Sequence, residues 1–436
     1  MKRTILLLLM LLLFISPAYA EDIIKKGELL TLERSIGIAL LRHPSILAAK
    51  GSVDVSRARE GQAESGYYPQ IAASAGYSRQ QPSTISTGTT TVGIRRIQTS
   101  HSFEQYSTGV NASQMLFDFG KTRTQVRVQN NYVDASRSDL GNIEEQVIFN
   151  VKQAYYDTLR AKRNREVAED TIRQFEHQLA QAKAFYEVGT RPKFDVTKAE
   201  VDLSTARLAL LRADNSVSIS LVNLNNAMGV PDAPQYMLEE HPFQPKALVS
   251  VEEAYKRAFE NRPDLMALAS RKKAAEESVA LAQKGYYPFL TGNAGWTWAG
   301  EGGQFATGDG WNAGVTLSVP IFTGFLTKNQ VAEAKATLSV VSANEEALKQ
   351  NVMLEVQQAY INLKEAAERI TVAALTVQQA TENSEIATGR YSAGVGNPIE
   401  VTDAEVALSR AKLSHNEALY DYVIAHASLE KAMGIR

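Results

Sequence analysis

Residues 186–208 read YEVGTRPKFDVTKAEVDLSTARL, and the same pattern returns at 391–413 as YSAGVGNPIEVTDAEVALSRAKL. In both stretches a proline-free, helix-compatible run meets Gly189 or Gly394, and a second run begins at Phe194 or Ile399. A connection of about five residues between two long helices forces them to run antiparallel. The chain is therefore predicted to contain two copies of one helical hairpin.

Further repeats extend the duplication over most of the chain. GYYP at 66–69 returns at 285–288, and VKQAYYDTL at 151–159 returns as VQQAYINLK at 356–364. The offset falls from 219 to 205 positions between these blocks, so the first copy has about 14 extra residues. They fall in the Ser- and Thr-rich segment 81–100, which is predicted to be a long exposed loop.

The duplication sets the domain organisation. Residues 1–20 precede a first repeat at 21–230, a proline-rich linker at 231–250 and a second repeat at 251–436. Periodic apolar residues predict long helices at about 121–188 and 194–228 in the first repeat, and at about 326–393 and 398–433 in the second. The predicted fold class is α+β, with two tandem repeats of strands and a long helical hairpin.

The first twenty residues have the features of a secretory signal peptide. Lys2 and Arg3 precede an apolar run from Ile5 to Ile15, and the small-residue triplet at 18–20 predicts cleavage before Glu21. The apolar run is too short to cross a bilayer as a helix. Because the sequence has 0 Cys, no acylated cysteine, disulfide or thiolate metal site is expected.

Composition and motifs exclude several functions. The formal net charge is -2 and no basic stripe is present, so no nucleic-acid partner is expected. We find no phosphate loop, nucleophile elbow or metal-binding histidine pair. The sequence therefore predicts a protein that is not an enzyme and has no cofactor.

Four segments alternate large apolar with small polar residues and are predicted to be strands. Their ranges are about 69–80, 104–117, 288–298 and 311–321. Strands of this length can cross a bilayer when tilted, and no later apolar run is long enough for a membrane helix. A half-buried sheet in a soluble protein is the alternative. Four strands cannot close a barrel in lipid, so closure requires several chains, and three would give 12 strands around a lumen.

The order of signal peptide, duplicated unit, GYYP before a strand, and hairpins of the form Y-x-x-G-x-x-x-[FI]-[DE]-V resembles the TolC-type outer membrane efflux proteins. The resemblance implies a homotrimer in outer-membrane lipid, with a 12-stranded β-barrel and a 12-helix α-barrel that projects into the periplasm. It implies an exit duct of a tripartite efflux pump or type I secretion system, with a periplasmic adaptor (membrane fusion) protein and an inner-membrane transporter as partners. The alternative is a periplasmic coiled-coil protein with a structural or adhesive role and no channel.

The resemblance also implies a periplasmic gate. Glu400 and Asp403 match a pair of carboxylates that narrows the entrance in relatives, whereas the first copy has Asp195 and Lys198. The two acids lie one helical turn apart in the first turn of a helix, where the helix dipole favours carboxylates. An ordinary acidic first turn has the same pattern, so that interpretation stays open.

Two other features of relatives map onto the hairpin turns. Tyr391 matches a tyrosine that helps to hold relatives closed, but the matching arginine position is Gly396, and Arg191 takes the equivalent place in the first copy. The turns are expected to dock with the adaptor through Gly189, Thr190, Gly394, Val395 and Gly396.

Overall fold

The computed structural model describes residues 24–81, 84–90, 93–99, 102–240, 249–301 and 308–435. The chain forms two compact units, and each unit combines segments from both repeats. The first unit is made from the described residues within 1–49, 140–263 and 350–436, and the second from those within 50–139 and 264–349. The predicted signal peptide at 1–20 lies outside the described residues.

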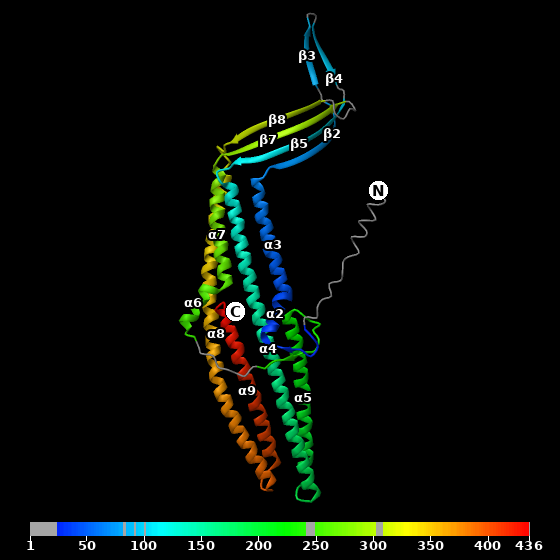
Figure 1. Ribbon diagram of the computed structural model, residues 1–436, viewed down its shortest axis with the longest axis vertical. Coiled ribbons are helices and arrows are strands. Elements are labelled where there is room, and N and C mark those ends of the chain that lie inside the picture. Colours follow the sequence, from blue (N-terminus) through cyan, green and yellow to red (C-terminus); the bar gives the residue numbers. More distant parts are fainter. Residues whose placement is uncertain are drawn as a thin grey trace, which may run out of the picture. The chain divides into compact units, whose positions relative to one another are not determined.

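Four strands form one antiparallel sheet in the second unit (Figure 1). They are β2 (Gln70–Gln80), β5 (Phe103–Phe117), β7 (Phe289–Glu301) and β8 (Gly308–Ser318), in the order β2-β5-β7-β8. Strand β8 begins and ends three residues earlier than its predicted range of 311–321. The reason is its partner: β7 continues the ladder as far as Ala299 opposite Gly308, and Pro320, which has no N–H group, follows the other end.

The register separates apolar from polar side chains. Val110, Trp296 and Trp311 form one row across β5, β7 and β8, on a face whose large side chains are exposed. The next row, on the opposite face, is Asn111, Gly295 and Asn312. A Cβ on Gly295 would lie 2.6 Å from Oδ1 of Asn111, so this polar face is closely packed. The predicted alternation therefore produces one apolar and one small polar face.

The segment 81–100 differs from the predicted loop. The structure forms a two-stranded antiparallel hairpin there, with β3 (Thr84–Thr90) and β4 (Gly93–Thr99). These strands contain many β-branched threonine and isoleucine residues, which favour extended backbone. The prediction was wrong because it used the lack of large apolar residues and ignored this preference.

Shorter helices precede the strands in both repeats. They are α2 (Leu32–Arg42) and α3 (Pro44–Glu64), followed by the 3-10 turn η1 (Ser65–Tyr67), and α6 (Val251–Asn261) and α7 (Pro263–Gln283), followed by η2 (Lys284–Tyr286). Thr31 and Ser250 cap α2 and α6, since each side chain accepts a hydrogen bond from a backbone N–H of the first turn.

The long helices follow the strands. Helix α4 (Lys121–Glu187) and helix α8 (Leu326–Ser392) have 67 residues each. Helices α5 (Lys193–Met228) and α9 (Pro398–Ala432) return from them to form two hairpins. At every end these bounds differ by one residue or less from the ranges predicted by sequence periodicity. None of the helices in the described ranges is apolar over enough residues to span a membrane.

The predicted linker contributes to the core of the first unit. Its strand β6 (Met237–Leu238) pairs in parallel with β1 (Leu29–Leu30), and Leu238 packs with Leu30 in the buried cluster. The hydroxyl of Tyr155 on α4 lies 3.1 Å from the carbonyl oxygen of Leu30 and 2.6 Å from that of Glu239, so it can donate a hydrogen bond to either one. The described part of 231–250 is therefore anchored, because its short strand completes the core; residues 241–248 lie outside the description.

Candidate functional site

The two hairpin turns lie in the same unit, at neighbouring ends of their hairpins (Figure 1). The first turn depends on Gly189, whose φ of 76° is in the left-handed region that glycine tolerates. The backbone N–H and the hydroxyl of Thr190 both donate to the carbonyl oxygen of Phe185, at 3.0 and 2.9 Å. These bonds end α4 and direct the chain into α5.

The second turn has the same length of five residues and contains two glycines. Gly394 has a φ of 81°, and the N–H groups of Val395 and Gly396 both donate to the carbonyl oxygen of Arg390, at 3.1 and 2.9 Å. A Cβ on Gly396 would lie 2.7 Å from the backbone nitrogen of Tyr391, closer than a real contact allows. The turn therefore has no room for the arginine that relatives were expected to place at this position.

An arginine nevertheless reaches this turn, from the other hairpin. Nη2 of Arg191 donates to the carbonyl oxygens of Gly394 at 3.2 Å and Gly396 at 3.0 Å. Its guanidinium carbon also lies 5.3 Å from the ring centroid of Tyr391, in cation-π range. Arg191 therefore joins the two tips through charge-assisted hydrogen bonds.

Tyr391 and Asp195 are buried beside this arginine. Tyr391 is 1% exposed and Asp195 is 4% exposed, and the tyrosine ring packs edge-on against Phe185 at 5.8 Å. Burial raises the pKa of the Tyr391 phenol, the charge of Asp195 raises it further, and Arg191 lowers it. The tyrosine hydroxyl and Oδ2 of Asp195 have no hydrogen-bond partner within the described ranges. The site therefore has a buried donor and a buried acceptor that can still be satisfied.

Further polar contacts connect the hairpins beyond the turns. The hydroxyl of Thr402 on α9 donates to Oδ2 of Asp202 on α5 at 2.8 Å, and Nζ of Lys198 contacts the same carboxylate at 2.5 and 2.7 Å. Nε2 of Gln178 lies 3.4 Å from the Thr402 hydroxyl. Lys198, which the repeat aligns with Asp403, therefore pairs within α5 with the carboxylate that Thr402 contacts from the other hairpin.

The sequence did not identify Asp202, Thr402 and Gln178 as site residues. The sequence did contain an indication that Asp202 has a partner. Asp202 is next to the apolar Leu203 of α5, which is buried, and a carboxylate beside a buried position requires a partner. Apolar packing accompanies the network, since Val196, Ala199, Leu203 and Ala206 along α5 are all buried.

Glu400 and Asp403 occupy a different environment. Both are exposed in the single chain, and Oε2 of Glu400 lies 3.6 Å from Nε of Arg390, with both side chains about half exposed. An ion pair this exposed contributes little to stability. The structure thus brings Arg191, Asp195 and Tyr391 together and leaves the two predicted gate carboxylates in solvent.

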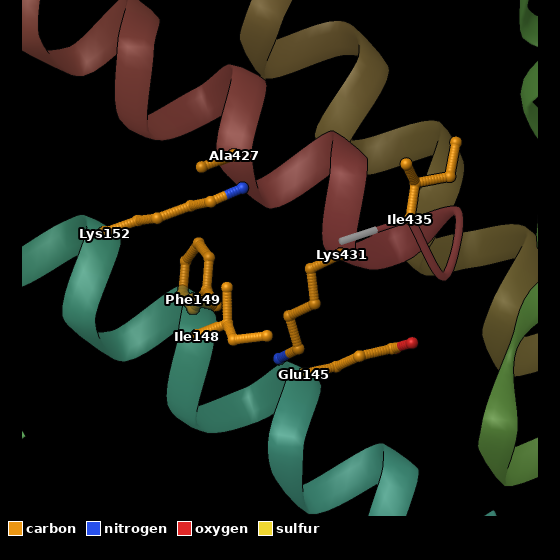
Figure 2. Close-up of a pocket in the computed structure, with 7 residues that line it drawn as sticks. All are labelled: Glu145, Ile148, Phe149, Lys152, Ala427, Lys431 and Ile435. Atoms are coloured by element: carbon orange, nitrogen blue, oxygen red, sulfur yellow. The ribbon is translucent and has the colours of Figure 1, made fainter. Parts of the chain in front are cut away.

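A separate cavity lies between α4 and α9 (Figure 2). It measures about 10 Å³, room for roughly one water molecule. Lys152 and Lys431 line it, and each ammonium already has a partner: Glu430 at 2.8 Å and Gln146 at 2.6 Å. This cavity is too small for a substrate.

The duplication, the two-faced sheet and the paired helical hairpins are together typical of channel-forming subunits. A family model described as "Outer membrane efflux protein" matches residues 35–230 and 254–435. The chain belongs to the outer membrane efflux protein family, which is a family of transport ducts.

Individual relatives agree with this membership. The outer membrane protein TolC of Vibrio cholerae is 24% identical over 404 residues, which cover 90% of this chain and 87% of that protein. The outer membrane efflux protein BepC of Brucella suis is 25% identical, with 93% of this chain and 85% of the relative covered. The crystal structure of the outer membrane protein VceC from Vibrio cholerae has the same fold, with a TM-score of 0.77, 21% identity, and coverage of 92% of this chain and 96% of that one.

Proposed function

We propose that this protein is the outer-membrane exit duct of a tripartite efflux pump or type I secretion system, and that it conducts substrates passively. Three chains would close the duct, with 12 strands in the membrane and 12 long helices in the periplasm. A periplasmic adaptor and an inner-membrane transporter would supply the cargo and the energy. The alternative of a coiled-coil structural protein without a channel has no support in a family of transport ducts.

The sheet is the observation that carries this proposal. Its edge strands β2 and β8 each have one side without a strand partner among the described residues. Large side chains on its apolar face are open to the surroundings, with Ile71 70% and Trp311 72% exposed. In lipid each unpaired backbone group costs several kcal/mol, so pairing with further copies is required. Three copies leave a lumen for the small polar face, whereas two would nearly fill it with side chains.

The gate is proposed at the hairpin tips. Arg191 would hold the second turn through its two carbonyl contacts, with Tyr391 and Asp195 buried behind it. Glu400 and Asp403 would face the entrance from each chain and concentrate negative charge there. Like charges at a narrow entrance favour cations, because each carboxylate attracts counter-ions, and counter-ions held there would restrict flow.

Planar bilayers test the charge ring. Replacing Glu400 and Asp403 by Ala should raise single-channel conductance and reduce cation preference. The matched control replaces Glu382 and Glu385 by Ala, since these acids are also exposed and have the same spacing on α8. Unchanged currents in the first variant, or equal changes in both, would place the constriction elsewhere.

The tips would also dock with the adaptor, through Gly189, Thr190, Gly394, Val395 and Gly396. Gly394 is a poor position for a test, because its positive φ would strain any side chain. Val395 is 72% exposed and carries no such strain, so Val395→Glu should abolish export while the trimer stays assembled. Val395→Thr, which keeps the shape without the charge, is the control. Normal export by Val395→Glu would remove this turn from the docking surface.

A further inference from the structure

The two junctions between sheet and helix share an unusual backbone. Phe119 and Gly120, between β5 and α4, have φ values of 52° and 77°, and Gly324 and Phe325, between β8 and α8, have 61° and 66°. Within the described ranges these phenylalanines are the only non-glycine residues with positive φ. The conformation strains a side chain that large. Both repeats keep a strained phenylalanine, although at different positions of the turn, which points to a function for the rings.

Both rings are exposed and lie among other aromatic side chains. Phe119 is 43% exposed and stacks on Tyr287 with centroids 5.6 Å apart. Phe325 is 62% exposed and packs edge-on against Phe322 at 5.5 Å. Exposed aromatic side chains at the end of a sheet with an apolar face suit the headgroup level of a bilayer.

An ammonium group accompanies each ring. Nζ of Lys284 donates to the carbonyl oxygen of Phe119 at 2.7 Å, and Nζ of Lys328 lies 5.9 Å from the ring centroid of Phe325. The two lysines come from different elements, η2 and α8. The neighbouring acid, Asp118, uses both oxygens to cap the first turn of α4. Each junction therefore combines an exposed ring with a cation.

We propose that these two junctions bind anionic phospholipid headgroups at the membrane surface from which the helices emerge. The rings would lie at the level of the glycerol, and Lys284 and Lys328 would contact the phosphates. A net negative lipid is favoured over a zwitterionic one because the ammonium groups add attraction for net charge. The inference rests on the proposed function, since it requires the sheet to lie in the membrane.

The test uses the full-length assembly in phosphatidylcholine vesicles that contain phosphatidylglycerol. Native mass spectrometry measures the ratio of retained phosphatidylglycerol to retained phosphatidylcholine. The wild type should prefer phosphatidylglycerol. Lys284→Gln and Lys328→Gln should each reduce this preference about fivefold, and the double variant should reduce it about 25-fold. Lys335→Gln, which removes an exposed lysine seven positions along α8 from Lys328, should leave the ratio unchanged.

Glycine substitutions separate lipid binding from a merely structural role. Phe119→Gly and Phe325→Gly remove the backbone strain, so the thermal midpoint in detergent should stay or rise, while the total amount of retained lipid falls because the rings no longer contact it. Equal retention of both lipids by the wild type, or an unchanged preference in the double lysine variant, would overturn the lipid proposal. Channel conductance in the same vesicles shows which proposal has failed. Conduction without lipid preference would contradict only the lipid sites. No conduction at any lipid composition would contradict both the proposed duct and the lipid sites.

Discussion

The tips of the two hairpins are copies of one sequence, yet they differ in charge and burial. At positions 205 residues apart the first tip has Arg191 and Asp195, and the second has Gly396 and Glu400. Asp195 is 4% exposed, whereas the Glu400 side chain is 51% exposed. The first tip supplies groups that hold the hairpins together, and the second leaves its carboxylate in solvent. Duplication has thus allowed one copy to specialise in contact and the other in exposed charge.

The largest effect is expected at the glycine that replaces the arginine. Gly396→Ala places a Cβ 2.7 Å from the Tyr391 nitrogen, so the second turn must rearrange at a cost of about 3 kcal/mol. Hydrogen exchange of amides at 389–399 should accelerate roughly 100-fold. Val395→Ala, in the same turn with an exposed side chain, is the control. Equal exchange in the two variants would show that the close approach at Gly396 does not determine this turn.

A second difference between the repeats concerns pH. Glu430 on α9 contacts Lys152 at 2.8 Å and His426 at 3.2 Å, whereas the equivalent residue of the first copy is Asn225. Burial alone would raise the pKa of Glu430, but hydrogen bonds from His426 and Lys152 and their charges lower it to about 2.

The sign of the pH effect follows from that lowered pKa. Ionised Glu430 stabilises the folded protein above its unfolded pKa, and the stabilisation, at most about 2 kcal/mol after allowance for partial exposure, is lost as pH falls from about 5 to about 2. After correction for the intrinsic pH dependence of amide exchange, protection in the C-terminal part of α9 should therefore fall over that range in the wild type and change little in Glu430→Gln. An equal loss of protection in the two proteins would contradict this assignment.

Arg191 provides the next test of the comparison. Arg191→Ala removes two hydrogen bonds to carbonyl oxygens and the contact with the Tyr391 ring, a loss of about 1.5 kcal/mol for a partly exposed group. Exchange at the second tip should rise roughly tenfold. Arg390→Ala removes only an exposed ion pair with Glu400 and should change exchange less than about twofold. If the two alanine variants behaved alike, Arg191 would have no special role.

The smallest effect is expected at the buried phenol. The Tyr391 hydroxyl has no partner among the described residues, so Tyr391→Phe should change local stability by less than about 0.5 kcal/mol in the isolated chain. A loss in the assembled channel but not in the isolated chain would indicate that assembly supplies the missing partner. Hydrogen exchange on both samples makes the comparison.

Repetition in the sequence predicted much of the fold. Gly189 predicts where α4 ends and Pro192 where α5 begins. Gly394 and Pro398 do the same for the end of α8 and the start of α9, because glycine and proline act through local backbone geometry. The position of β8 was less predictable, since it depends on pairing with β7 and not on its own residues. The hairpin at 84–99 was missed because threonine-rich strands lack the apolar signal.

The candidate site was predictable only in part. The family pattern singled out Tyr391, Arg191 and Asp195, which the structure brings together. That Arg191 bonds to two carbonyl oxygens of the other hairpin was not predictable, because backbone acceptors have no sequence signature. Asp202 and Thr402 were missed for a related reason: their contact joins residues 200 positions apart, and its geometry depends on how the two hairpins pack.

Arg191, contributed by the first hairpin, would hold the second hairpin closed at the entrance of the proposed duct. The most direct test is the single-channel conductance of the assembled protein in planar bilayers, for the wild type and Arg191→Ala, with Arg390→Ala as control. The wild type and the control should have a small conductance, and Arg191→Ala a clearly larger one. Equal conductance in all three would contradict this role of Arg191.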